Sequence, residues 1–197
     1  MTTSPADAPV AVQSRRAGGY RRRFLAVARI AVGLYFGFEA VRKISHGWLA
    51  GGSDFVHTVT AYPSARGGGF YHSFVTGLVL PHAGLFAFLV TLGECVAAVS
   101  LILGLLTRLG ALIALWLNLN FLLLRGFANS SAMIDRAFLV ANALFLVTAA
   151  GRTWGLDDRF RDTLARHPMT RWLAGARARR QTPATLKQVT LGAGTDQ

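Results

Sequence analysis

The sequence contains little cysteine and little charge. Its 197 residues include one cysteine, Cys95, and Asp, Glu, Lys and Arg together account for only 15% of the chain. One cysteine excludes an internal disulfide, CxxC redox chemistry and a metal site built on several cysteines. A soluble domain is nearer a quarter charged, whereas 52% of this chain is apolar. The composition therefore indicates a membrane protein.

Motifs for haem, nucleotide and metal are also lacking. None of the five histidines lies within a long apolar run, so the axial ligands of an intramembrane haem are missing. No GxGxxG motif follows a strand-like segment, and the histidines are irregularly spaced. We therefore predict no haem, no nucleotide and no metal site.

Long apolar runs are what the sequence does contain. Four of them approach the roughly 20 residues needed to cross about 30 Å of hydrocarbon, at Phe24–Ile44, Ala83–Leu106, Leu109–Leu124 and Ile134–Ala150. Only Thr107 and Arg108 separate the second run from the third, which predicts a tight antiparallel hairpin with its turn at these two residues. The predicted fold class is all-α, a four-helix transmembrane bundle. The membrane domain is assigned to residues 21–160, with a disordered cytoplasmic tail at 1–20 and a basic cytoplasmic tail at 161–197.

The distribution of basic residues predicts the orientation of the bundle. The net charge is +12, but the lysines and arginines flank the apolar runs and do not line a soluble face, which argues against nucleic acid as a partner. Fifteen of them lie in segments that are inside when both termini are cytoplasmic, and five lie in outer segments. This bias favours an N-in, C-in protein whose basic flanks bind anionic membrane lipids. The long loop at Ser45–His82 is then outside, and its apolar part, Phe70–Leu80, is predicted to be interfacial or re-entrant.

Glu94 is the most informative polar residue inside a predicted span. It lies near the middle of the second run, with no opposite charge three or four residues away. Its partner must come from another helix, or its carboxyl must be protonated, because burial disfavours the charged form. Gly93 and Ala97 beside it are small enough to let another helix approach closely. Glu94 is therefore the best candidate for a catalytic residue.

The other three runs contribute further polar groups. Counted at 1.5 Å per residue from the inner ends, Glu94 and three asparagines lie about 12 to 18 Å deep. This predicts one polar cluster inside the bundle, formed by Arg29, Glu94, Asn118, Asn120 and Asn142. The cluster either binds a quinone or only holds the helices together, at about 0.6 kcal/mol per hydrogen bond. Arg29 has the alternative of extending to the cytoplasmic surface.

Charged residues also mark the outer end of the first run. Glu39 is followed three and four residues later by Arg42 and Lys43 on the same helical face, which we interpret as structural pairing near the outer interface. Together with Arg66, Arg125 and Arg136, these basic residues are expected to attract an anionic substrate to the outer side.

Three stretches of the chain carry motifs that occur together in one family. The first is RIAVGLYFGFEAVRK at Arg29–Lys43, followed by GWLAGG. The second is GECVAAVSLILGLLTRL at Gly93–Leu109, where an acidic residue leads to a Leu-Gly-Leu-x-Thr-Arg turn. The third is GRTWGLDD at Gly151–Asp158, which is similar to a closing Gly-Arg-x-x-x-Leu-Asp motif. Over about residues 24 to 160 the chain resembles the DoxX family, and its DoxD-like branch in particular.

The resemblance implies a four-helix protein in the plasma membrane of a bacterium. DoxD-like members include the membrane subunit of thiosulfate:quinone oxidoreductase, which works with a small DoxA-like partner. The function implied is a quinone-linked redox subunit, with quinone as cofactor and Glu94 exchanging protons. One alternative is a non-catalytic membrane protein that anchors or organises a redox or envelope complex. Another is a small transporter, in which four spans would require a homo-oligomer and Glu94 would be the proton site.

Overall fold

The computed structural model describes residues 8–50, 52–62, 64, 68–148 and 150–160, and within these ranges every regular element is a helix. Four candidate membrane spans in the described residues, starting at Gly19, Ala83, Thr107 and Ser130, are long and apolar enough to cross a bilayer. The all-α, four-helix membrane fold is thereby confirmed, while the N-in, C-in orientation stays a prediction. The long helices are α1 (Ala8–Ser45), α5 (Ala83–Leu103), α6 (Thr107–Arg125) and α7 (Met133–Val147).

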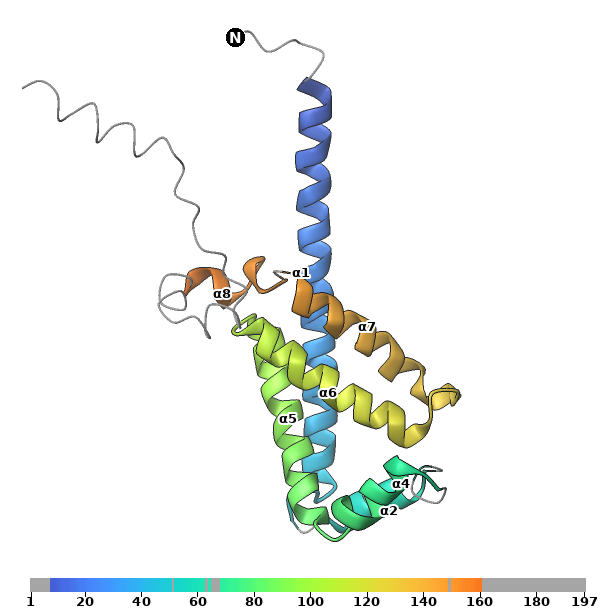
Figure 1. Cartoon of the computed structure of the whole chain (residues 1–197). Helices are drawn as coiled ribbons and strands as arrows, with labels where there is room; N and C mark the ends of the chain where they lie inside the picture. Colours follow the sequence, from blue (N-terminus) through green and yellow to red (C-terminus); the bar gives the residue numbers. More distant parts are fainter. Residues whose placement is uncertain (1–7, 51, 63, 65–67, 149, 161–197) are drawn as a thin grey trace, which may run out of the picture.

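The long helices pack in chain order. α5 lies against α1, α6 against α5 and α7 against α6, and α7 also touches α1. Figure 1 shows α1 projecting beyond the other helices at its N-terminal end, with α6 and α7 crossing obliquely. Shorter helical segments follow the long ones: α2 (Ser53–Thr60), α4 (Phe70–Phe74), the π-helix η2 (Val75–Val79), the 3₁₀ turns η3 (Ser130–Ala132) and η4 (Ala150–Arg152), and α8 (Leu156–Arg159).

The start of α1 differs from the prediction for the N-terminal segment. We predicted a disordered tail over residues 1–20, but α1 begins at Ala8, so residues 8–20 are helical. Gly18 and Gly19 do not end the helix, because a helix that is already nucleated extends at one hydrogen bond per added residue. The predicted basic tail at 161–197 lies outside the described residues.

The turn between α5 and α6 also differs from its predicted position. Thr107 and Arg108 belong to the first turn of α6, and the chain reverses at Gly104–Leu106. Gly104 caps α5 in the left-handed conformation (φ +63°), where glycine carries no steric penalty. Leu106 also has a positive φ, +49°. The apolar pattern of the sequence did not reveal this chain reversal, because Gly104 and Leu106 both lie inside an apolar run.

The predicted outer loop is largely helical. α2, α4 and η2 pack with the first part of α5 around a second apolar cluster, which contains Trp48, Phe55, Val59, Val75, Val79 and Ala87. Figure 1 places α2 and α4 at the end of the bundle opposite the N-terminus. The Phe70–Leu80 stretch is thus a short helix that continues as a π-helix. Its depth in a membrane stays a prediction.

Small residues line the helix crossings, and large apolar residues face outward. Ala97, Ala111 and Ala114 are completely buried, whereas Phe38 and Val147 are more than half exposed. Lipid tails are as apolar as leucine, so helix association in a membrane depends on close packing and interhelical hydrogen bonds. The outward surface suits hydrocarbon, and the small residues allow the backbones to approach closely.

Two glycines of α1 give a matched test of this packing. A Cβ at Gly33 would lie 2.9 Å from the backbone nitrogen of Ile102 on α5, whereas a Cβ at Gly37 would lie 3.7 Å from Ala98 Cβ. We expect Gly33→Ala to destabilise the protein by about 1–3 kcal/mol, because α5 backbone cannot give way. Gly37→Ala should be neutral or stabilising by up to about 1 kcal/mol, because alanine favours helix.

Thermal unfolding of both variants in detergent micelles measures this difference. Equal melting temperatures for the two variants would contradict the α1–α5 packing described above.

Candidate functional site

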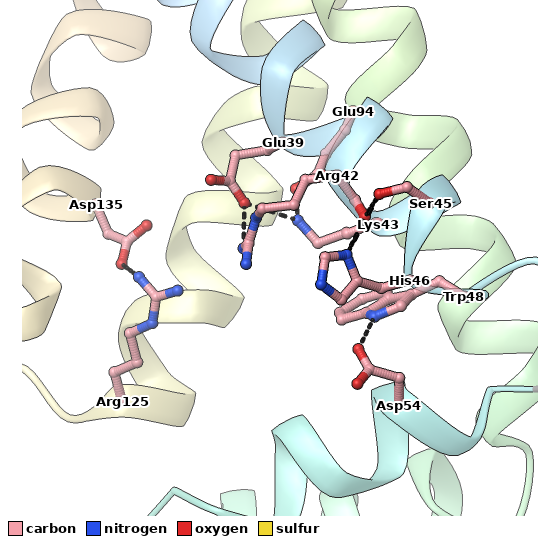
Figure 2. Close-up of polar contacts among 10 residues, drawn as sticks. All are labelled: Glu39, Arg42, Lys43, Ser45, His46, Trp48, Asp54, Glu94, Arg125 and Asp135. Carbon is pink, nitrogen blue, oxygen red and sulfur yellow. Dashed lines mark hydrogen bonds and ion pairs between the residues drawn. The ribbon is translucent and has the colours of Figure 1, made fainter.

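Charged side chains gather where α1 ends. Arg42 donates to Glu39 at 2.7 Å, and Lys43 Nζ lies 2.5 Å from Glu94 Oε1 on α5. Across from them, Arg125 at the end of α6 pairs with Asp135 of α7. Figure 2 shows these pairs converging from α1, α5 and the α6–α7 hairpin. A partner for Glu94 therefore comes from another helix, which is one of the two alternatives that the sequence left open.

Lys43 is held by two carboxylates and two aromatic rings. Besides Glu94, its ammonium nitrogen lies 3.5 Å from Glu39 Oε2. It also lies 5.2 Å from the ring centre of Trp48 and 5.4 Å from that of Phe121, within the range of cation–π attraction. Only 8% of its side chain is exposed. Lys43 is thus a buried cation that bridges α1 and α5, and not only a surface partner of Glu39.

These residues line a cavity of about 180 Å³, which we call the polar cavity. Each carboxylate in its wall accepts a hydrogen bond. Arg42 donates to Glu39, Lys43 to Glu94 and Arg125 to Asp135. The indole of Trp48 donates to Asp54 at 2.8 Å. The polar and charged residues in the wall are Tyr35, Glu39, Arg42, Lys43, His46, Trp48, Asp54, Thr58, Tyr62, Glu94, Asn118, Arg125 and Asp135.

Two buried polar atoms in the wall of the polar cavity have no partner. Glu94 Oε2 and Asn118 Nδ2 make no hydrogen bond, and their residues are only 1% and 2% exposed. An unpaired buried polar group costs about 1–3 kcal/mol, so such a group beside a cavity indicates a bound water or ligand. The volume is enough for a small ring or a few waters.

A second, apolar cavity adjoins the first. It measures about 590 Å³ and is lined from α2, α4, η2, α5 and α6. Four residues line both cavities: Phe55, Val59, Phe121 and Leu124. Leu89 and Trp116 in its wall are about half or more exposed on the outward face of the bundle. The apolar cavity is therefore accessible from the lipid side, and its size suits an organic ligand.

Tyr71 and Asn120 lie beside the apolar cavity. The Tyr71 hydroxyl donates to the backbone oxygen of Asn120 at 3.0 Å, which ties α4 to α6. Burial raises the pKa of Tyr71 to about 12, so its hydroxyl stays protonated. The Asn120 amide donates to Trp116 O one turn earlier. The predicted site residue Asn120 thus borders the apolar cavity with its amide already engaged.

Arg29 lies in a different place from the polar cavity. It is completely buried, and its guanidinium donates to the carbonyl oxygens of Ala150 (3.4 Å) and Trp154 (3.2 Å). A Cβ on Gly104 would collide with it, so Arg29 is level with the end of α5. Glu94 is ten residues earlier on α5, about 15 Å along the axis. The single cluster predicted from depth is therefore wrong for Arg29, and so is its extension to the surface.

Asp157 completes the arrangement around Arg29. Its carboxylate accepts from Leu106 N (2.7 Å) and Thr107 N (3.2 Å), which caps α6, and its own amide donates to Gly104 O. Burial raises the pKa of Asp157, opposed by these amide donors and by the nearby charge of Arg29. We call Arg29, Gly104, Leu106, Asp157 and the η4–α8 backbone the Arg29 cluster. It joins the Leu-Gly-Leu-x-Thr-Arg turn to the closing motif.

Asn142 is buried on α7, and neither amide atom has a partner. Asn118 and Asn142 each lie seven residues, about two turns, from the Arg125–Asp135 pair that links α6 to α7. The antiparallel register thus puts the two amides at the same level. Asn142 does not line either cavity. Of the five predicted residues, Glu94 and Asn118 share the polar cavity, and the other three lie elsewhere.

Sequence reasoning missed Asp135 and Asp157, and it did not pair Lys43 with Glu94. The signal for Lys43 was present: Arg29, Val32, Phe36, Ala40 and Lys43 recur every three or four residues and form the buried face of α1. Among the described residues no group of three or more His, Cys, Asp or Glu is placed to hold a metal ion.

The comparisons with known proteins bear on the first three long helices. A family model described as DoxX matches residues 24–124. This range includes α1 from Phe24, every residue that lines the apolar cavity, and all of those that line the polar cavity except Arg125 and Asp135. The match ends before the closing motif at Gly151–Asp158. No curated protein and no solved structure gives a significant match.

Proposed function

Because the chain belongs to the DoxX family of membrane proteins, we propose that it binds a quinone between α1, α2, α5 and α6 and serves as the quinone-linked membrane subunit of a thiosulfate-oxidising system. The observation that carries the proposal is the junction of the two cavities. A quinone has a polar ring and an apolar isoprenoid tail. The polar cavity offers the ring two unsatisfied polar atoms, and the apolar cavity offers the tail an apolar wall open to lipid.

The residues in the polar cavity fit the head of a quinone. Asn118 Nδ2 is a donor without a partner and is suited to a quinone oxygen. Glu94 is the candidate group for proton exchange with the quinone. Its carboxyl is buried, its Oε2 has no partner, and Lys43 connects it to Glu39. When bound, the quinone supplies two-electron chemistry, while these side chains orient the ring and hold or release a proton.

Oxidation of the sulfur anion is assigned to a partner protein. Arg42, Lys43 and Arg125 are each paired with a carboxylate, which reduces the attraction they exert on an anion. A DoxA-like partner at the end of the bundle formed by α2 and α4 would supply the anion site and pass electrons to the quinone. The setting proposed is the plasma membrane of a bacterium.

Blocking the apolar cavity tests this proposal. Val90 lines the apolar cavity, whereas Val99, nine residues later on α5, is 57% exposed and lines neither cavity. We expect protein purified from membranes to carry about one quinone per chain. Val90→Trp should lower that ratio at least tenfold by filling the space of the tail, and Val99→Trp should leave it unchanged. The ratio is read by extracting the lipid fraction and quantifying quinones by chromatography.

An activity assay completes the test. The purified protein, with its DoxA-like partner, should reduce a soluble quinone analogue when thiosulfate is added, and Val90→Trp should abolish the reduction. Absence of bound quinone together with absence of turnover would contradict the proposal and favour the organising role.

A further inference from the structure

The two unpartnered atoms of the polar cavity differ in hydrogen-bonding character. Asn118 Nδ2 is a donor only. Glu94 Oε2 is an acceptor when the carboxyl is ionised, and the same carboxyl becomes a donor when protonated. One ligand group can therefore satisfy both atoms only if its own donors and acceptors match the protonation state of Glu94.

The two redox forms of a quinone differ in the same property. An oxidised quinone presents carbonyl oxygens, which only accept hydrogen bonds, whereas a quinol hydroxyl both donates and accepts. Asn118 Nδ2 suits either form. Ionised Glu94 suits only the quinol hydroxyl, because two facing acceptors repel each other and leave a buried acceptor unsatisfied. Protonated Glu94 suits the oxidised quinone.

We propose that Glu94 makes the site distinguish the two redox forms, so that binding of the oxidised quinone takes up one proton at Glu94 and binding of the quinol does not. This inference rests on the proposed function of quinone binding. It adds that the redox form of the bound quinone determines whether Glu94 takes up a proton.

The surroundings of Lys43 allow Glu94 to change its charge. Lys43 is 2.5 Å from Glu94 Oε1 and 3.5 Å from Glu39 Oε2, and it also faces the rings of Trp48 and Phe121. When Glu94 takes up a proton, the ammonium of Lys43 keeps Glu39 and both rings as partners. A buried ion pair usually resists protonation, because loss of one charge strands the other. A cation shared between two carboxylates avoids that penalty.

The other carboxyls and cations around the polar cavity already have partners. On α1, Arg42 pairs with Glu39. On α6 and α7, Arg125 pairs with Asp135. On α2, Asp54 accepts from the Trp48 indole. Directly after α1, His46 Nδ1 lies 2.7 Å from Arg42 O. Tyr35 and Tyr62 complete the titratable wall. Among these carboxyls, Glu94 combines burial with an oxygen that has no partner.

Binding measured against pH tests the inference. The probes are decylubiquinone and its quinol, titrated anaerobically into the full-length protein in nanodiscs between pH 5 and pH 9. Trp48 and Trp116 line the two cavities, so quenching of tryptophan fluorescence reports occupancy. In the pH range where Glu94 is ionised in the free protein, the Kd of the oxidised form should rise about tenfold per pH unit, as expected for uptake of one proton on binding. The Kd of the quinol should stay constant over the same range.

Three variants identify the group responsible. Glu94→Gln should make both Kd values independent of pH, and Glu39→Gln should retain the wild-type slopes. Asn118→Leu should raise both Kd values by a similar factor, about tenfold, with the slopes unchanged, because it removes a donor that serves both forms.

The outcomes separate this inference from the proposed function. Parallel pH profiles for the two redox forms in the wild type would overturn it, and so would a tenfold slope that persists in Glu94→Gln or disappears in Glu39→Gln. If neither form binds at any pH, the proposed quinone binding itself is wrong.

Discussion

Lys43→Met is expected to destabilise the protein by about 3–5 kcal/mol, because it strands a buried carboxylate. Glu94 is 1% exposed, and Lys43 donates to one of its oxygens while the other has no partner. Arg42→Met removes a cation one residue away whose side chain is 51% exposed, and exposed pairs contribute about 1 kcal/mol or less. The two variants thus remove the same charge from adjacent positions with different expected results.

A double variant separates the cost of a stranded charge from the value of the pair. Replacing a buried ion pair by apolar residues of similar size is often neutral or stabilising. Lys43→Met combined with Glu94→Met should therefore recover most of the stability lost in Lys43→Met. The stability of all three variants is measured in detergent by unfolding with heat or SDS, with the helical circular dichroism signal as the readout. A double variant as unstable as the single one would show that Lys43 acts mainly through Glu39 and the aromatic rings.

Asp157→Ala is the second substitution with a large expected effect, again about 3–5 kcal/mol. It removes the charged acceptor of two backbone amides at the start of α6, and hydrogen bonds to charged groups contribute about 1.5–3 kcal/mol each. It also removes the negative charge nearest to the fully buried Arg29. Asp157→Asn keeps one oxygen acceptor and should fall between the wild type and Asp157→Ala.

A glycine pair tests the Arg29 cluster without changing any charge. A Cβ on Gly155 would collide with Gly151 O and would lie 2.6 Å from an Arg29 guanidinium nitrogen. A Cβ on Gly77 would meet nothing within 4 Å. Gly155→Ala should lower the melting temperature strongly, whereas Gly77→Ala should leave it unchanged. If both alanines are tolerated equally, the closing motif does not pack against Arg29 as described.

The sequence predicted the helices well and their mutual register poorly. Hydrophobic length located all four spans, since about 20 apolar residues are needed to cross a bilayer. Glu94 and Asn118 were identified because a polar group inside an apolar run has to be satisfied by something outside its own helix. These inferences depend on single helices, which the local sequence determines.

The predictions that were wrong depended on contacts between helices. Arg29 and Glu94 were assigned to one polar cluster, but the α1–α5 contact places Lys43, and not Arg29, beside Glu94. The offset of an antiparallel helix pair is determined by where small residues let the partner helix approach, here Gly33 against Ile102 and Gly37 against Ala98. No local pattern encodes that offset. The partners of Arg29 were also out of reach, because they are backbone carbonyls in the segment after the last span.

The position of the partners of Arg29 has a consequence for biosynthesis. Its two carbonyl partners lie 121 and 125 residues later in the chain. A charged residue at the centre of a helix costs about 2.5–3.5 kcal/mol during translocon insertion, and α1 leaves the ribosome long before Ala150 and Trp154 exist. The hydrogen bonds that satisfy Arg29 can therefore form only after the η4–α8 segment has been synthesised, so the segment that follows the last span completes the surroundings of the first helix.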